Sequence, residues 1–225
     1  MSEHYYSSHD VQHVAELIKQ HSLLYEQLFE KLAREMYSQL TQVRETQSSM
    51  NNAITYCYQL AELAQQDFQL YFPNRDTLAC QQGCHHCCSL PVEVPIQVVQ
   101  HIADFLQQQL SAESLQQLQT KLTDYSQEPA TIEKKRPCPF LTADNACSIY
   151  SHRPPACRAF TSPDVGLCLR SVQTGSQVPQ SPVTLRIYEA MTSAFLADAQ
   201  THLNQPNAKQ VAFIPALNQA LSQCE

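Results

Sequence analysis

The chain has 225 residues, of which 43% are hydrophobic and 16% are charged, and its net charge is -7. A chain of this length can bury a stable core without cross-links, so its ten cysteines are not obliged to form disulfides. The acidic balance argues against nucleic acid or an anionic lipid surface as the main partner, and no run of ~18 apolar residues predicts a membrane span.

The first twenty residues lack a basic segment followed by an apolar one, so we expect no secretory signal and a cytoplasmic location. In that reducing compartment, a dense cysteine pattern indicates metal binding or catalysis more often than disulfides.

Residues 10–72 predict an N-terminal helical hairpin, because the segment is free of Gly and Pro and is apolar at helical spacing. The polar stretch at residues 45–52 predicts the break between its two helices. The first apolar stripe comprises Val14, Leu17, Ile18, Leu24, Tyr25, Leu28, Leu32, Met36, Leu40 and Val43; the second comprises Ile54, Tyr58, Leu60, Leu63 and Phe68. We expect core rather than the seam of a coiled-coil dimer, because the repeat leaves heptad register near residues 33–36.

Residues 77–171 differ in composition and hold eight of the ten cysteines. Within this region a helix is predicted to begin at Pro95, where a missing N–H costs nothing, and a second helix over residues 111–125. The stripe of the first comprises Ile96, Val99, Ile102, Phe105 and Leu106. A turn-rich linker follows, and residues 182–225 predict C-terminal helices. We therefore expect a mostly α protein, a single domain over residues 1–225, whose helices surround a loop-rich cysteine cluster.

The eight cysteines form two groups. The first comprises Cys80, Cys84, Cys87 and Cys88; the second comprises Cys138, Cys147, Cys157 and Cys168. Thiolates three or four residues apart can reach one ion from a turn, and two such groups are a much stronger signal than one. Oxygen-preferring magnesium and calcium are disfavoured by this ligand set.

Eight thiols match two tetrahedral sites of four thiolates, or one iron–sulfur cluster with the other thiols structural or redox-active. The sequence leaves open which metal binds, how many ions bind and which cysteines share an ion. Neighbouring side chains tend to point apart, so we expect Cys87 and Cys88 to seldom chelate one ion together.

Other residues near the cysteines have candidate roles. Gly83 is expected to take a positive backbone angle that turns the chain around an ion. His85 or His86 could replace a cysteine as ligand, whereas His152 is expected at the surface or behind the ligands. Cys57 and Cys224 are expected to be bystanders. The basic residues Lys134, Lys135, Arg136, Arg153, Arg158 and Arg170 either offset the thiolate charge or form an ordinary solvated face.

The motifs CQQGCHHCCSLPVEV, CPFL and CSIYSHRPPACRAF, with the later Cys168, resemble the YkgJ-type cysteine cluster proteins, which carry a zinc- or iron-chelating domain. The resemblance spans about residues 80–168. It implies metal chelation by these cysteines in a bacterial cytosolic protein. Some relatives are labelled iron–sulfur oxidoreductases or flagellin lysine methylases, but no Gly-rich loop here predicts a nucleotide or S-adenosylmethionine site.

Three functional hypotheses result. The preferred one is a metal-binding protein that chelates zinc or iron, with a structural or a storage and delivery role. The second is an iron–sulfur redox or protein methyl-transfer enzyme. The third is an interaction module whose N-terminal helices bind a protein partner, and an exposed apolar stripe on those helices would favour it. No catalytic residue is assigned, because eight thiols in two groups are a poor match to a single activated nucleophile.

Overall fold

The computed structural model describes residues 8–46, 49–72, 77–131, 134–203 and 205–223. This part of the chain is mostly α-helical, as predicted. Its regular sheet is a two-stranded antiparallel ribbon in which β1 (Glu93–Val94) pairs with β2 (Val211–Ala212). The ribbon ties the chain just after the first cysteine group to the chain just before the last helix.

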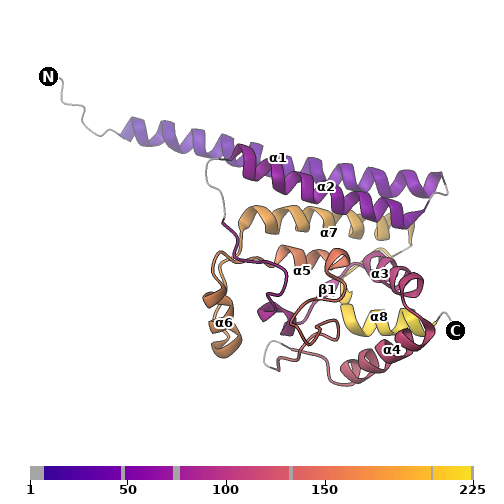
Figure 1. Ribbon diagram of the computed structural model, residues 1–225. Coiled ribbons are helices and arrows are strands. Elements are labelled where there is room, and N and C mark those ends of the chain that lie inside the picture. Colours follow the sequence, from indigo (N-terminus) through magenta and orange to yellow (C-terminus); the bar gives the residue numbers. More distant parts are fainter. Residues whose placement is uncertain (1–7, 47–48, 73–76, 132–133, 204, 224–225) are drawn as a thin grey trace.

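The N-terminal hairpin consists of α1 (Ser8–Glu45) and α2 (Met50–Tyr71), which lie side by side across one edge of the molecule (Figure 1). The break falls within the polar stretch at 45–52, as predicted. Phe29 of α1 and Phe68 of α2 stack face to face with ring centroids 5.3 Å apart. Their contact fixes the spacing of the two helices where α2 nears its end.

The first half of α1 is not core, and the prediction that its stripe is buried is wrong there. Met36 and Leu40 are fully buried, but Val14, Leu17, Ile18, Leu24 and Leu28 are exposed. The reason is length: α1 has 38 residues and α2 has 22, so the first turns of α1 extend beyond the helices that cover the rest (Figure 1).

The helix α7 (Pro182–His202) lies between the hairpin and the cysteine region (Figure 1). The Ser181 hydroxyl caps it by accepting the Thr184 N–H, and Pro182 occupies the first turn, where no backbone donor is needed. It packs against α1, α2 and α5. Ile187, Met191 and Phe195 are therefore fully buried.

The remaining core is built from α3 (Ile96–Gln109), α4 (Ala112–Gln127) and α8 (Phe213–Ser222). Both predicted helices after Pro95 are present, with Pro95 as the N-cap of α3 and Ser111 as the N-cap of α4. Val99, Ile102 and Leu106 are buried as expected. The helix α8 packs against α3 and α4 and completes this side of the molecule.

A buried carboxylate joins three helices. Asp198 of α7 is fully buried and accepts two hydrogen bonds of 2.7 Å from the Arg44 guanidinium at the end of α1. The Gln97 amide of α3 donates to the same carboxylate at 2.9 Å. Because each partner comes from a different element, Asp198 sets how the hairpin sits on the rest of the fold.

Two short helices replace part of the predicted loops. Cys157 lies in α5 (Pro155–Ala159) and Cys168 in α6 (Val165–Thr174), which runs into the predicted linker. Pro155 fixes the backbone angle at the start of α5. The Asp164 carboxylate caps α6 by accepting the Gly166 N–H at 2.7 Å.

No helix in the part of the chain that the structure describes combines the length and the apolar character needed to cross a bilayer.

Candidate metal centre

The first cysteine group sits on a tight turn followed by the 3-10 helix η1 (His86–Ser89). Gly83 has φ = 92°, the left-handed region that was expected, and an added Cβ would meet no atom within 4 Å. The requirement at Gly83 is therefore conformational rather than steric. The Cys84 N–H donates to the Gln81 carbonyl at 3.0 Å and closes the turn.

The second group is carried by three short pieces of chain. Cys138 and Cys147 flank a small loop closed by the bridge between Leu141 and Cys147. Asn145 turns that loop with φ = 60°, a conformation that Asn tolerates better than most residues. Cys157 and Cys168 follow on α5 and α6.

Backbone hydrogen bonds fasten the two groups together. The Cys138 N–H donates to the Cys88 carbonyl at 2.7 Å, and the Ala79 N–H donates to the Ser162 carbonyl at 2.9 Å. The Ser162 N–H donates to the Cys80 sulfur at 3.2 Å. Segments that are about fifty to eighty residues apart are thus held side by side by the main chain itself.

Six of the eight predicted ligands line one cavity of about 230 Å³; they are Cys84, Cys87, Cys88, Cys138, Cys147 and Cys157. The rest of its wall is largely apolar and comes from the chain after each cysteine group and from the start of α8. Such a cavity brings both cysteine groups to one space with little polar competition for an ion.

Cys80 and Cys168 do not line this cavity. Cys168 is 7% exposed on α6, which packs against η1. Burial raises the pKa of the Cys84 thiol, and the nearby sulfurs of Cys80, Cys87 and Cys168 raise it further. Cys80 and Cys168 therefore lie near Cys84 but outside the cavity wall.

The thiols fall into two neighbourhoods that share Cys87. Burial raises the pKa of the Cys157 thiol above its usual range, and Cys138, Cys87 and Cys147 add to the effect. Burial likewise dominates at Cys80, where Cys168 and Cys87 contribute. One neighbourhood contains Cys80, Cys84 and Cys168, and the other contains Cys138, Cys147 and Cys157.

Backbone amides point at three sulfurs in the same way. Burial raises the pKa of Cys138 to about 11, and a hydrogen bond from the Phe140 N–H opposes that rise. Cys84 and Cys147 have the same opposing bond from His86 and Ile149, each two residues on. Amide donors two residues beyond a cysteine stabilise negative sulfur, the state in which a thiol ligates metal.

The adjacent cysteines do not point apart, contrary to expectation. The neighbouring Cys88 side chain raises the pKa of Cys87 above its usual range, and burial adds to it. Both residues lie in η1, where successive side chains diverge by about 120° rather than the roughly 180° of a strand. The 3-10 backbone therefore keeps the two sulfurs together.

Among the six basic residues noted in the sequence, Arg153 lines the cavity. Its guanidinium stacks on Tyr150 at 3.9 Å from the ring centroid. Lys135 instead donates to carbonyls at the end of α6, and Arg136 to carbonyls at the end of α4. Arg158 bonds the Glu62 carboxylate at 2.7 Å. The charge-offset interpretation thus fits Arg153, whereas Lys135, Arg136 and Arg158 bind other parts of the chain.

The candidate histidines are not on the cavity wall. The His85 and His86 rings lie 4.8 Å apart beside the first group, and the His152 ring stacks on Phe105 with centroids 3.6 Å apart. Cys57 is fully buried in α2 as a small apolar side chain, as expected. Cys224 lies outside the described residues.

The donor set fits a thiophilic metal. All nine described cysteines are free thiols, and backbone amides already face several of the sulfurs. Within the described residues, no three His, Cys, Asp or Glu side chains are placed to hold one ion as they stand.

Sequence reasoning missed part of the site. Phe213 and Ile214, more than forty residues beyond the last cysteine of the cluster, form cavity wall, and Ser162 supports Cys80. The apolar run at the start of α8 was the available signal for the first two. Nothing in the sequence pattern marks Ser162, because its contribution is a main-chain amide.

Comparison with known families adds a decisive observation. Residues 79–180 match the family CxxCxxCC, described as a "putative zinc- or iron-chelating domain". The match covers 102 of the 225 residues and includes both cysteine groups. The resemblance expected from the cysteine motifs is thereby confirmed. The CxxCxxCC domain here has one more residue between Cys80 and Cys84 than the family name spells, and Gly83 lies in that interval. No curated protein and no solved structure matches the chain.

Proposed function

We propose that the protein binds zinc or iron through thiolates of all eight clustered cysteines. The observation that carries the proposal is the cavity lined by six of them, which come from two separate segments. Its apolar wall and the amide donors directed at Cys84, Cys138 and Cys147 support thiolate chemistry there.

The two neighbourhoods support two sets of four ligands. One set would be Cys80, Cys84 and Cys168, and the other Cys138, Cys147 and Cys157, with Cys87 and Cys88 completing one set each. A divalent ion with four thiolates carries a formal charge of about -2. Arg153 on the cavity wall would offset part of it. Zinc would organise the chain around it, whereas iron would add redox chemistry and visible absorption.

The test is metal analysis of protein purified without air, with an absorption spectrum. We expect two ions per chain, and an absorption band from sulfur-to-iron charge transfer if the metal is iron. Cys157→Ala and Cys168→Ala should each lower the content by about one ion, while Cys57→Ala, a buried thiol away from the cavity, should keep both.

Circular dichroism of each variant checks that the helices remain. A wild-type protein without bound metal, or equal metal content in all three variants, would contradict the proposal.

A further inference from the structure

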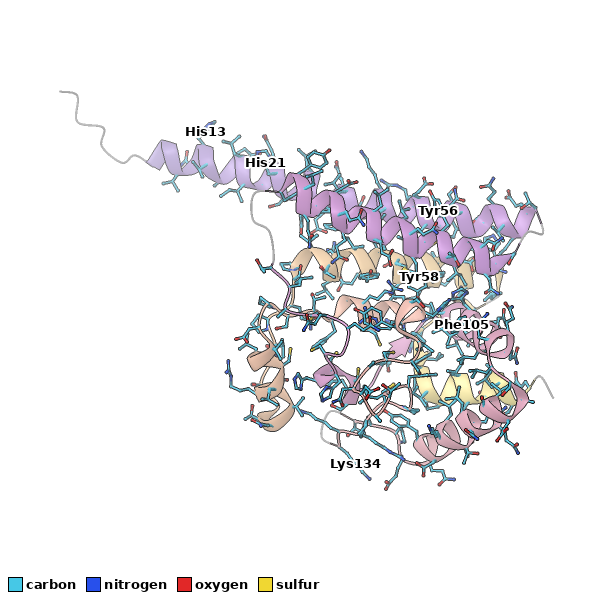
Figure 2. The ribbon with its side chains drawn as sticks, viewed as in Figure 1. His13, His21, Tyr56, Tyr58, Phe105 and Lys134 are labelled. Atoms are coloured by element: carbon cyan, nitrogen blue, oxygen red, sulfur yellow. The ribbon has the colours of Figure 1, made fainter. Side chains whose placement is uncertain are left out.

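The extended part of α1 carries an apolar surface that the metal centre does not use. This surface, the α1 stripe, comprises Val14, Leu17, Ile18, Leu24 and Leu28, whose exposed fractions lie between 40% and 61%. His21 lies among them on the same part of the helix (Figure 2). Side chains of this kind cost free energy when they face water.

Little of the described chain covers this surface. Among the residues that the structure describes, the end of the hairpin reaches it at Phe72, which borders a shallow hollow together with Ile18 and Leu24. From the exposed fractions, the α1 stripe has an area on the order of 500 Å², within the range for the largest patch on a typical monomer and often functional. Its size and continuity point to an interaction surface.

The spacing indicates another helix as the occupant. Val14, Leu17, His21, Leu24 and Leu28 follow at alternating intervals of three and four residues, which is the spacing of a coiled-coil seam. The heptad register is lost near residues 33–36, where α1 enters the core. The register therefore holds over the exposed part of the helix and stops where burial within the chain begins.

The charges around the α1 stripe argue against a lipid surface. Glu16, Lys19, Glu26, Glu30 and Lys31 mix both signs on the rest of this part of the helix. Helices that lie on anionic membranes carry a Lys/Arg-rich polar face, which α1 lacks. A second α1 offers a matching seam of the same length and no excess of like charge.

We propose that the α1 stripe packs against the α1 stripe of a second copy of this chain, forming a two-fold homodimer. A two-fold pair uses the same patch twice, so a self-complementary seam suffices. Two such patches bury roughly 1,000 Å², the lower limit of a specific interface, so the dimer is weak, with a dissociation constant in the micromolar range. His21 within the seam is a polar residue that lowers its stability.

Sedimentation equilibrium from about 1 to 200 μM of the full chain tests the proposal. Wild-type protein should pass from monomer to dimer over this range. Leu24→Glu should raise the dissociation constant at least tenfold, because it places like charges in the seam. His21→Leu should lower the dissociation constant about tenfold by removing the polar group from the seam.

Leu23→Glu is the matched control. Leu23 is 57% exposed on the same helix but points to the opposite face, so its substitution should leave the dissociation constant unchanged. Metal content should equal that of wild type in all three variants, which separates this proposal from that for the metal centre. A chain that stays monomeric throughout, or equal effects of Leu23→Glu and Leu24→Glu, would overturn it.

Discussion

Arg153 is a basic side chain on the wall of the cavity that six of the clustered cysteines line. Its Nε donates to the Tyr150 carbonyl at 3.2 Å, and its guanidinium lies on the Tyr150 ring. These contacts hold the positive charge in one place. A fixed charge beside thiolates contributes more than a mobile one, since no ordering is required when the ion binds.

We expect Arg153→Met to lower metal affinity about tenfold, because the partners behind metal ligands have effects of this size. Competition against a chromophoric chelator measures the change. Arg136→Met is the control, since Arg136 binds carbonyls at the end of α4 rather than the cavity. Equal affinities for the two variants would mean that Arg153 has no electrostatic role.

His101 makes stability depend on pH. It is 6% exposed, its Nδ1 lies 2.9 Å from the Asn51 side-chain oxygen, and burial lowers its pKa to about 4. Between about pH 6.5 and 4 the unfolded chain binds the proton and the folded chain does not. Stability should therefore fall by on the order of 2 kcal/mol as the pH drops through this window.

Urea unfolding at several pH values measures this loss. In His101→Asn the slope between pH 6.5 and 4.5 should flatten, whereas His13→Asn, on the exposed part of α1, should keep the wild-type slope. The assignment fails if both variants retain the same dependence on pH.

At the residue scale, the convergence of the two cysteine groups on one cavity and the positive backbone angle of Gly83 could be predicted from the sequence, because cysteine spacing and backbone needs are local. The sequence could not show that Arg153, rather than Lys135 or Arg136, lies on the cavity wall. Long basic side chains reach partners that only the folded chain supplies, and here those partners are the ends of α4 and α6.

Among the helices, the junction at Asp198 has the largest expected effect. Asp198→Ala would leave Arg44 and Gln97 without their shared acceptor, and the free energy of unfolding should fall by about 3 kcal/mol. Urea denaturation measures the change. Glu189→Ala on the same helix removes an exposed pair with Arg186 and should cost less than about 1 kcal/mol.

A loss at Asp198 no larger than that at Glu189 would show that the three helices are held by packing alone. Both substitutions lie on α7 and both remove one carboxylate, so the net charge changes alike, and the helix propensities of Asp and Glu differ by only a few tenths of a kcal/mol. The difference between them isolates burial.

Helices were predicted correctly where capping residues and a regular apolar stripe indicate the same helix. Ser111 and Pro95 mark helix starts by their own chemistry, and the stripe of α3 matches its buried face. The predicted burial was wrong for the first half of α1, because periodicity predicts an apolar face but not which part of the chain covers that face. The prediction also missed α6, whose start depends on the Asp164 side chain reaching the Gly166 amide.

Across the whole molecule, the metal proposal predicts uneven stability. The two cysteine segments, residues 79–94 and 138–171, have short elements, whereas α7 is buried against several helices. Removing metal should lower the melting temperature and increase hydrogen exchange first in these two segments, while α7 stays protected. Exchange measured with and without a chelator checks this, and an unchanged pattern would contradict it.

The contact between Cys87 and Cys88 links the two neighbourhoods through a single turn of chain. If each sulfur serves a different ion, capturing the first fixes the backbone from which the second ligand projects. Metal binding would then be positively cooperative. When the metal supplied is too little to fill all sites, few chains would hold a single ion. Native mass spectrometry during titration would reveal this as a direct passage from empty to doubly loaded protein.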